Sequence, residues 1–476
     1  MSLSHNALIK RASFFYKKGD YHNALIFLNE VIKTDSLNFS VLIQIASCYE
    51  NLGQYQKSLN CLNKVQSYLP NNFFVLNQIS IILSKGREYK KALEINEKLI
   101  SIQKNNPQLY NNKGIFLQKI GKFEKSISAF NRAIRINSEE PKFYNNKGNS
   151  LMRLNLINEA VSCYEMSISL NSAYSSAYYN LSLAYLTLGE FKKGWEYYEY
   201  RIHQPDVKLN HPKISLPLWS GEENLRGKKI YIYVEQGYGD MIQFSRYLKL
   251  ITDMGAEIFI NFPKVLAKLF ANFEKIVLVS DNSFLQKVDY YCPLMSLPNK
   301  FKTTLENIPD PLVFQNFPFK ESYSSILKKV GIVWRGSKTN INDKVRSINL
   351  RKFDDILRLN LEFHSFQVDH NKGELSFLNE YKVLSYDEKI EDFLDTAKLV
   401  HSMDLIITVD TAIAHLAGTL NKSCWLMLPF HADFRWMLET DLSPWYKSLR
   451  IFRQKEIDNW DSVLSNIHKE LTEKIK

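Results

Sequence analysis

A glycine-rich turn and an aspartate stand together in VEQGYGDMIQF, residues 234–244. The stretch follows the apolar run IYIYV, so a strand is expected to end here and a helix to begin. Such a turn usually holds a phosphate on its backbone N–H groups, but a carboxylate at a helix start repels an anion. The dinucleotide fingerprint also needs a third glycine, and after Gly237 and Gly239 this chain has Ile242. A dinucleotide-dependent dehydrogenase is therefore a poor interpretation.

A second turn has the features of an anion site. The buried run DLIITV is followed by DTAIAHLAGTL, which predicts a strand and then a helix that Asp410 or Thr411 can cap. The backbone N–H groups of Thr411, Ala412 and Ile413 would then favour a diphosphate. His415 shares a helix face with Thr411 and could contact a phosphate or a sugar. The alternative is a capped helix with a histidine packed against its neighbour.

Basic residues follow a third strand, GIVW. Arg335, Lys344 and Arg346 lie in WRGSKTNINDKVRSI. A leaving diphosphate needs compensating positive charge, and an arginine or lysine supplies it without a metal. These residues extend the predicted diphosphate site.

If the phosphates lie on that side, the turn of Gln236, Gly237 and Gly239 faces the acceptor. Asp240 can then act as general base toward an attacking hydroxyl, and the two glycines let the substrate approach the backbone. The competing role for Asp240 is to cap a helix that begins at Met241.

The elements that position these loops alternate between strand and helix from Lys228 onward. One series runs through KIYIYV, EIFINF and KIVLV, and a second through KKVGIVW, LEFHSFQV and DLIITV. Two Rossmann-like lobes with ligand at the carboxyl ends of their strands are expected, at residues 229–325 on the acceptor side and 326–476 on the donor side. Residues 205–228, which contain Pro205, Pro212 and Pro217, are expected to form a linker or docking segment.

Residues 1–204 repeat with a period of 34, in six frames that begin at His5, Phe39, Phe73, Pro107, Pro141 and Ser175. Small residues recur at the eighth and twentieth places, where two helices must cross closely. Large apolar residues recur at the eleventh and seventeenth. This is the tetratricopeptide pattern, which predicts an all-α superhelix of stacked helix pairs that holds protein partners.

One column of the repeats consists mainly of side-chain amides. The sixth place of the frames carries Lys10, Gln44, Gln78, Asn112, Asn146 and Asn180. Such a file could hydrogen-bond the backbone of an extended peptide of any sequence. The alternative is that a chain rich in asparagine places it everywhere. The column resembles the asparagine ladder of O-GlcNAc transferases, in which a superhelix precedes a glycosyltransferase domain.

Composition narrows the class of protein. With 476 residues, 45% hydrophobic and 23% charged, the chain is long enough for several globular domains. The net charge of +11 permits acidic ligands, but acidic residues are mixed throughout and nucleic acid is not expected. Five scattered cysteines form no C-x-x-C metal site and are expected to be reduced. Without an apolar leader or an ~18-residue apolar stretch, the expected location is the cytoplasm, or the inner face of the membrane.

The second half of the chain resembles the catalytic half of a known family. EQGYGDMIQFSRYL and DLIITVDTAIAHLAGTLNKSCWLMLPFHADFRWMLETDLSPWYKSLRIFRQ look like tetratricopeptide-containing glycosyltransferases related to the bacterial heptosyltransferases, and LPLWSGE resembles the entry to that domain. The resemblance implies a GT-B fold, a nucleotide-diphosphate sugar donor, inversion and no required metal. It makes Asp240 the base and assigns Asp410, Thr411 and His415 to the diphosphate, with Arg346 at the position of the family's lysine. Ala412 stands where heptosyltransferases usually have glycine, and WMLETDLSPWY either closes the donor side or is core.

The resulting hypothesis is an inverting glycosyltransferase. It would move a sugar from a nucleotide donor to a hydroxyl of a protein, as the repeats suggest, or of a cell-envelope saccharide, as the heptosyltransferase likeness suggests. The alternative is an interaction scaffold whose second half binds nucleotide or carbohydrate without turnover. The sequence does not identify the sugar, the base of the nucleotide or the oligomeric state.

Overall fold

The computed structural model describes residues 4–204, 214–271, 273–281, 283–314, 327–337, 343–386 and 389–475. Packing divides the chain into two compact units, Met1–Ala177 and Tyr178–Lys476. Pro205 and Pro212 of the predicted linker, the end of the first predicted lobe at 315–325 and residues 338–342 of the basic loop lie outside the described residues.

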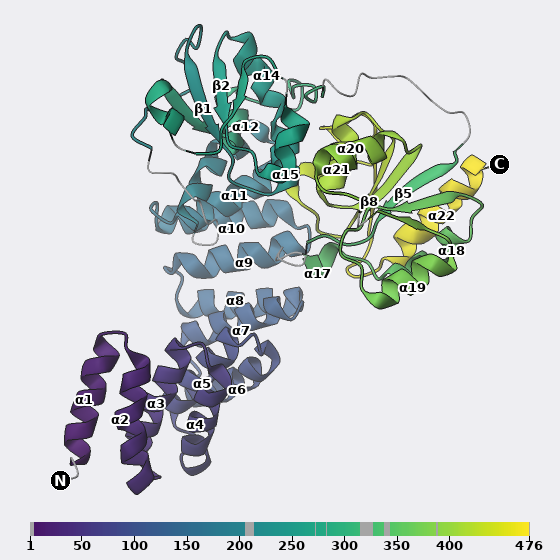
Figure 1. The fold of residues 1–476 in the computed structure, drawn as a ribbon. Helices are drawn as coiled ribbons and strands as arrows, with labels where there is room; N and C mark the ends of the chain where they lie inside the picture. Colours follow the sequence, from purple (N-terminus) through teal and green to yellow (C-terminus); the bar gives the residue numbers. More distant parts are fainter. Residues whose placement is uncertain are drawn as a thin grey trace. The chain divides into compact units, whose positions relative to one another are not determined.

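Helix pairs fill the first unit, each packed on the next along the chain (Figure 1). They are α1 (His5–Lys17), α2 (Tyr21–Thr34), α3 (Phe39–Asn51), α4 (Tyr55–Tyr68), α5 (Phe73–Lys85), α6 (Tyr89–Ile102), α7 (Pro107–Lys119), α8 (Phe123–Ile136), α9 (Pro141–Arg153) and α10 (Ile157–Leu170). A sixth pair consists of α11 (Ser175–Thr187) and α12 (Phe191–Tyr198), and the 3₁₀ helix η1 (Glu199–His203) continues it.

The predicted period is confirmed to the residue. The first helix of every pair begins at the first place of its frame, and the second helix begins at the seventeenth. The turn between them needs a positive φ at the fifteenth place, which glycine adopts at least cost. Gly19 and Gly121 have φ of 78°, while Arg87 and Asn155 occupy the same place in the third and fifth pairs at 61° and 58°.

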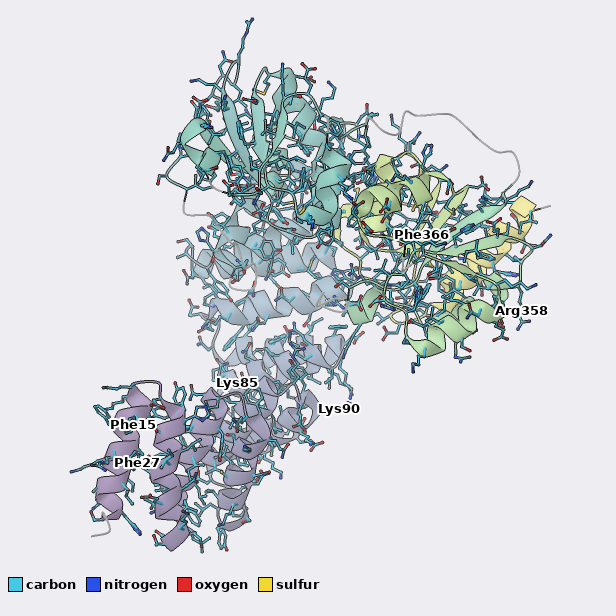
Figure 2. The ribbon with its side chains drawn as sticks, viewed as in Figure 1. Phe15, Phe27, Lys85, Lys90, Arg358 and Phe366 are labelled. Carbon is cyan, nitrogen blue, oxygen red and sulfur yellow. The ribbon has the colours of Figure 1, made fainter. Side chains whose placement is uncertain are left out.

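Small and large side chains interlock between the helices of a pair. A Cβ atom added to Gly148 would lie 2.5 Å from Cε1 of Tyr164, which is fully buried. In the first pair, Phe15 and Phe27 stack with ring centroids 5.6 Å apart (Figure 2). In the fourth and fifth pairs, where Gly114 meets Phe130 and Gly148 meets Tyr164, the eighth place is therefore glycine because an aromatic ring from the partner helix fills the space above it.

The second unit contains two wholly parallel sheets, as the alternation of strands and helices predicts. The first has the order β3-β2-β1-β4. Its elements are β1 (Lys229–Tyr233), α13 (Tyr238–Phe244), α14 (Arg246–Asp253), β2 (Glu257–Ile260), α15 (Lys264–Ala267), η2 (Lys268–Phe270), β3 (Ile276–Leu278), η3 (Ser283–Lys287), β4 (Tyr290–Pro293), η4 (Leu294–Ser296) and α16 (Leu297–Lys300).

The second sheet has the order β10-β9-β8-β5-β6-β7. Its elements are β5 (Lys329–Val333), α17 (Asp343–Arg346), η5 (Leu350–Phe353), α18 (Asp354–Leu357), β6 (Glu362–Ser365), α19 (Lys372–Glu380), β7 (Leu384–Ser385), α20 (Phe393–His401), β8 (Leu405–Val409), α21 (Ala412–Thr419), β9 (Cys424–Leu428), η6 (Phe434–Trp436), β10 (Leu449–Arg453) and α22 (Asp461–Ile475).

The strand order of both sheets reverses beside the predicted loops. In the first sheet, β1 lies between β2 and β4, so the connections on its two sides run in opposite directions. In the second, the reversal falls between β5 and β8. Ligands of open α/β sheets bind outside the carboxyl ends of the strands at such a point, and the strands β1, β5 and β8 precede the three loops that the sequence singled out.

The sixth helix pair belongs to the core of the second unit. Trp195 and Tyr198 of α12 are buried in the same hydrophobic cluster as Phe244 of α13 and Trp445 of the second lobe. Leu218 forms a parallel bridge to Tyr291, so part of the predicted docking segment extends the first sheet. The 34-residue period therefore continues past the point at which packing changes from helix pairs to sheets.

Two predictions made from the composition concern the state of the cysteines and the presence of a membrane-spanning helix. All five cysteines are free thiols, as expected. None of the helices in the described part of the chain combines the length and apolar character that crossing a bilayer requires.

We expect Gly148→Ala to destabilise the first unit by about 1–3 kcal/mol, because the buried Tyr164 ring cannot yield without strain. Urea unfolding followed by circular dichroism at 222 nm measures this. Gly86→Ala is the matched control, since its Cβ would come no closer than 3.4 Å to a neighbour. Equal midpoints for the two variants would contradict the packing argument.

Candidate functional site

The first turns of α13 and α21 meet where the two sheets face each other. A Cβ atom on Gly239 would lie 2.7 Å from Cδ2 of His415 and 3.5 Å from Cα of Ala412. Only a glycine permits this approach. Its role in this structure is to let one helix pack on the other, and the approach of a substrate to the backbone here stays a prediction.

Asp240 lies within the first turn of α13, which begins at Tyr238 and not at the predicted Met241. Gly237 is the N-cap, and its N–H donates to Asp240 Oδ2 at 2.9 Å. Oδ1 accepts from Nη2 of Arg435. Burial raises the pKa of the Asp240 carboxyl, Arg435 opposes this, and Asp433 adds to it. The carboxylate thus both caps the turn and carries an ion pair, with a fifth of its side chain exposed.

Arg435 is the main functional candidate that sequence reasoning missed. It lies in η6, after β9, and reaches across to the first lobe. Its Nε donates to Oε1 of Gln243 at 2.8 Å, and its Nη1 donates to Asp433 at 2.7 Å. The sequence did contain a signal for this region. The apolar run CWLML is typical of a buried strand, and if that strand joins the sheet of DLIITV, its carboxyl end lies at the same edge as the predicted anion site.

Asp410 and Thr411 follow β8 as predicted. Thr411 is the N-cap of α21, and its Oγ1 accepts from the N–H of Ile413 at 3.3 Å. Arg346 donates to the backbone oxygen of Asp410 at 2.6 Å, so two predicted loops meet here. Burial and the nearby Asp433 raise the pKa of Asp410 to about 6, while Arg346 and Arg435 oppose the shift.

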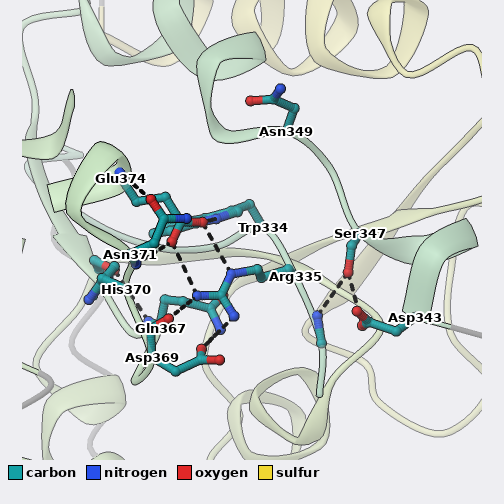
Figure 3. Close-up of polar contacts among 12 residues, drawn as sticks. Trp334, Arg335, Asp343, Ser347, Asn349, Gln367, Asp369, His370, Asn371 and Glu374 are labelled. Atoms are coloured by element: carbon teal, nitrogen blue, oxygen red, sulfur yellow. Dashed lines mark hydrogen bonds and ion pairs between the residues drawn. The ribbon is translucent and has the colours of Figure 1, made fainter. Parts of the chain in front are cut away.

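The three basic residues predicted to bind the diphosphate have different neighbours. Arg335 lies between two carboxylates (Figure 3): Glu374 accepts from its Nε and Nη2 at 3.2 Å, and Asp369 accepts from Nη1 at 2.5 Å. Its charge is therefore already compensated. Lys344 is exposed on α17. Arg346 alone is joined to the turn after β8.

His415 is almost fully buried, with 5% of its surface exposed. Its ring stacks on Trp436 with centroids 5.3 Å apart, and Nδ1 lies 3.2 Å from the hydroxyl oxygen of Tyr446. Burial, aided by Arg435 and Arg246, lowers its pKa well below the ordinary value, so the imidazole is neutral. Trp436, Trp445 and Tyr446 are buried too. These aromatic residues of WMLETDLSPWY are core, and His415 packs among them.

Gln236 links the acceptor-side turn to the sixth helix pair. Its Nε2 donates to the hydroxyl of Tyr198 at 2.9 Å. Beside it, the fully buried Arg201 donates to Oε1 of Glu235 at 2.5 Å and to Ser296 at 2.9 Å. Burial raises the pKa of Glu235 against the effect of Arg201. The turn before Asp240 is thus held from the last repeat.

The amide side chains of the sixth-place column are half-buried, and neighbouring side chains use part of their hydrogen-bonding capacity. Asn146 Nδ2 donates to Oδ1 of Asn111 at 2.9 Å, and Gln108 Nε2 donates to Oδ1 of Asn112 at 3.0 Å. Gln44, Gln78 and Asn180 are also half-buried on α3, α5 and α11. These bonds within and between helix pairs give at least two of the amides a structural role.

Comparison with known families identifies the repeats. The tetratricopeptide repeat model matches residues 39–72, 107–140, 141–174 and 175–199. Four of the six frames derived from the sequence begin at these positions. The N-terminal half therefore carries tetratricopeptide repeats, which favour a role in holding protein partners.

Similar proteins include Protein FlbA of Caulobacter vibrioides, which is 24% identical over 318 residues, 59% of this chain. The chain spans 52% of that relative's length. Among solved structures, MamA of Desulfovibrio magneticus RS-1 is 22% identical over 37% of this chain and 98% of its own, with a TM-score of 0.34. A tetratricopeptide repeat protein of Parabacteroides merdae is 15% identical over 42% of this chain and 79% of its own, with a TM-score of 0.39.

We expect Gly239→Ala to destabilise the second unit by about 1–3 kcal/mol, because the buried His415 has no room to move. The midpoint of urea unfolding, followed by tryptophan fluorescence, measures the loss. Gly237→Ala is the control two residues away, since its Cβ would lie 3.4 Å from the nearest atom, Oδ2 of Asp240. A larger loss in the control would contradict the proposed packing role of Gly239.

We expect Asp410→Asn to change how stability depends on pH. The raised pKa means that the protonated carboxyl is favoured in the folded chain, so its contribution is present near pH 4 and is lost as the pH rises through about 6. Melting curves at pH 4–8 should show the variant exceeding the wild type by roughly 2–4 °C at pH 8 and not at pH 4. Asp310→Asn, an exposed control, should follow the wild type. A difference independent of pH would contradict the assignment.

Proposed function

We propose that this chain is an inverting, metal-independent glycosyltransferase of the GT-B type that uses a nucleotide-diphosphate sugar. One observation carries the proposal most directly. The strand order of both parallel sheets reverses at the strands that precede the predicted loops, and the loops meet through α13 and α21. A donor bound at one reversal point would lie opposite an acceptor bound at the other.

Asp240 is the proposed base. It would take the proton of an acceptor hydroxyl as that oxygen bonds to the anomeric carbon, while the bond from this carbon to the diphosphate oxygen breaks with its electron pair. This requires the ionised carboxylate. Arg435 favours that form, although burial opposes it. A carboxyl with a raised pKa is a stronger base than an ordinary aspartate once it is ionised.

The proposed donor side consists of Thr411, Ala412 and the first turn of α21, together with Arg346. The helix N-terminus favours the leaving diphosphate, and Arg346 already bonds to the backbone of Asp410. Lys344 is an exposed second cation. Arg335 and His415 are weaker candidates than the sequence suggested, because Arg335 is neutralised by Glu374 and Asp369, and His415 is neutral and buried.

The tetratricopeptide repeats support a protein as the acceptor, or as a partner that brings the acceptor. A cell-envelope saccharide is the alternative. The competing function is an interaction scaffold whose sheets bind nucleotide or carbohydrate without turnover. Either function is consistent with repeats that hold proteins.

A thermal-shift titration with ADP, UDP, GDP and dTDP, each with and without Mg²⁺, tests the proposal. A ligand of the folded state stabilises that state by mass action, by about 2.7 kcal/mol at a hundredfold excess over Kd, and so raises the melting temperature. We expect one nucleotide to do so equally with and without the metal. No shift with any nucleotide would count against both the transferase and the nucleotide-binding scaffold.

We expect Asp240→Asn to keep the nucleotide shift while abolishing turnover, because the amide cannot accept the proton. Hydrolysis of the matching sugar nucleotide, with water as acceptor, measures turnover, and Asp253→Asn on the exposed end of α14 is the control. Unchanged turnover in Asp240→Asn would leave the scaffold as the better interpretation.

A further inference from the structure

Arg435 meets Asp240 from the opposite lobe. Asp240 lies on α13 of the first lobe, whereas Arg435 comes from η6 of the second, 195 residues further along the chain. No local geometry forces this pair together. It exists only when the carboxyl ends of the two sheets face each other.

The guanidinium is fixed at every edge. Nε donates to Gln243 at 2.8 Å, Nη1 to Asp433 at 2.7 Å, and Nη2 to Asp240. Its carbon lies 4.5 Å from the ring centroid of Phe434 and 5.6 Å from that of Phe244. With 8% of the side chain exposed, Arg435 cannot swing away without breaking buried contacts. The planar group therefore presents one N–H edge to Asp240 in a single orientation.

The Asp240 carboxylate is consequently held at both oxygens. Oδ2 accepts from the N–H of Gly237 at 2.9 Å, and Oδ1 accepts from Arg435. The plane of the carboxylate is thereby set by one bond from its own helix and one from the other lobe. A fifth of the Asp240 side chain nevertheless stays exposed.

We propose that Arg435 is the positioning residue of the Asp240 carboxylate, so that the base is in its working orientation only when the second lobe is docked. This rests on the proposed function for the meaning of that orientation. Arg435 itself touches no reacting atom in this scheme. It acts through Asp240.

The charges around Asp240 come from several elements. Arg435 and Asp433 belong to the segment after β9, while Tyr198 on α12 and Tyr179 on α11 lie within its electrostatic reach. Burial raises the pKas of both tyrosines, so they are uncharged near neutral pH. Arg435 is then the principal positive charge acting on the carboxylate, against Asp433.

The first experiment needs no substrate. The melting temperatures of the full chain and of its Asp240→Asn variant are measured from pH 3.5 to 9. The difference between the two melting temperatures changes as Asp240 titrates, and the pH halfway through this change is the titration midpoint of Asp240. In Arg435→Met that midpoint should lie about 1–3 pH units higher, because an opposite charge near the carboxylate is lost. Arg246→Met is the matched control: this buried arginine also joins the lobes, but it bonds to the carbonyls of Gln243, Pro309 and Trp445. It should leave the midpoint unchanged. An unmoved midpoint in Arg435→Met would overturn the proposal.

The second experiment separates charge from orientation. Arg435→Lys keeps the positive charge but cannot reach Asp240, Asp433 and Gln243 together. We expect the midpoint to stay close to the wild type, nucleotide Kd to change less than about threefold, and kcat for sugar-nucleotide hydrolysis to fall about 10–100-fold. Wild-type kcat in Arg435→Lys would overturn the positioning role. If the wild-type chain binds no nucleotide, the proposed function fails separately, while the midpoint still shows whether Arg435 controls the carboxylate.

Discussion

The close approach of α13 and α21 is the contact on which the second unit depends. Gly239 removes the one side-chain atom that would separate the helices, and His415 fills the space against it. Because the helices follow β1 and β8, their contact brings the carboxyl ends of the two sheets together. Arg246 reinforces it with bonds to the backbone of Trp445 and with its charge over the Trp445 ring at 5.3 Å. Without this approach, the loop after β1 would not lie beside the loops after β5 and β8.

Charge balance at this contact is a second constraint. Asp240, Asp410 and Asp433 share their surroundings with Arg346 and Arg435, so the carboxylates outnumber the guanidinium groups. Burial makes this excess costly, and the raised pKas of Asp240 and Asp410 are the consequence. A diphosphate would add negative charge to the same place. The helix N-terminus of α21 and a proton on Asp410 are two means by which this chain could offset it.

The sequence predicted the repeats best because their information is local. A helix pair needs small residues where its helices cross and a positive φ in the turn between them. Both features recur every 34 residues, so the first residue of each helix could be predicted from the period. Strands β1, β5 and β8 were equally accessible as apolar runs. The side-chain contacts of the candidate site could not be predicted from such local patterns. Arg335 looked like a free cation because its partners Asp369 and Glu374 lie 34 and 39 residues further on. Arg435 was overlooked because its importance comes from its ion pair with Asp240, which lies in the other lobe.

The sixth repeat shows where a periodic pattern stops describing the packing. Its sequence follows the frame, yet Trp195 and Tyr198 are core residues of the second unit, and Tyr198 and Arg201 hold Gln236 and Glu235 in the turn before Asp240. Arg201 is buried with more negative than positive charge around it, from Glu199 and Glu235. Removing Arg201 would leave the buried carboxylate of Glu235 without its compensating charge, which costs several kcal/mol. The end of the repeat array is therefore part of the framework that fixes the proposed base, and a boundary drawn from the repeats alone would cut through it.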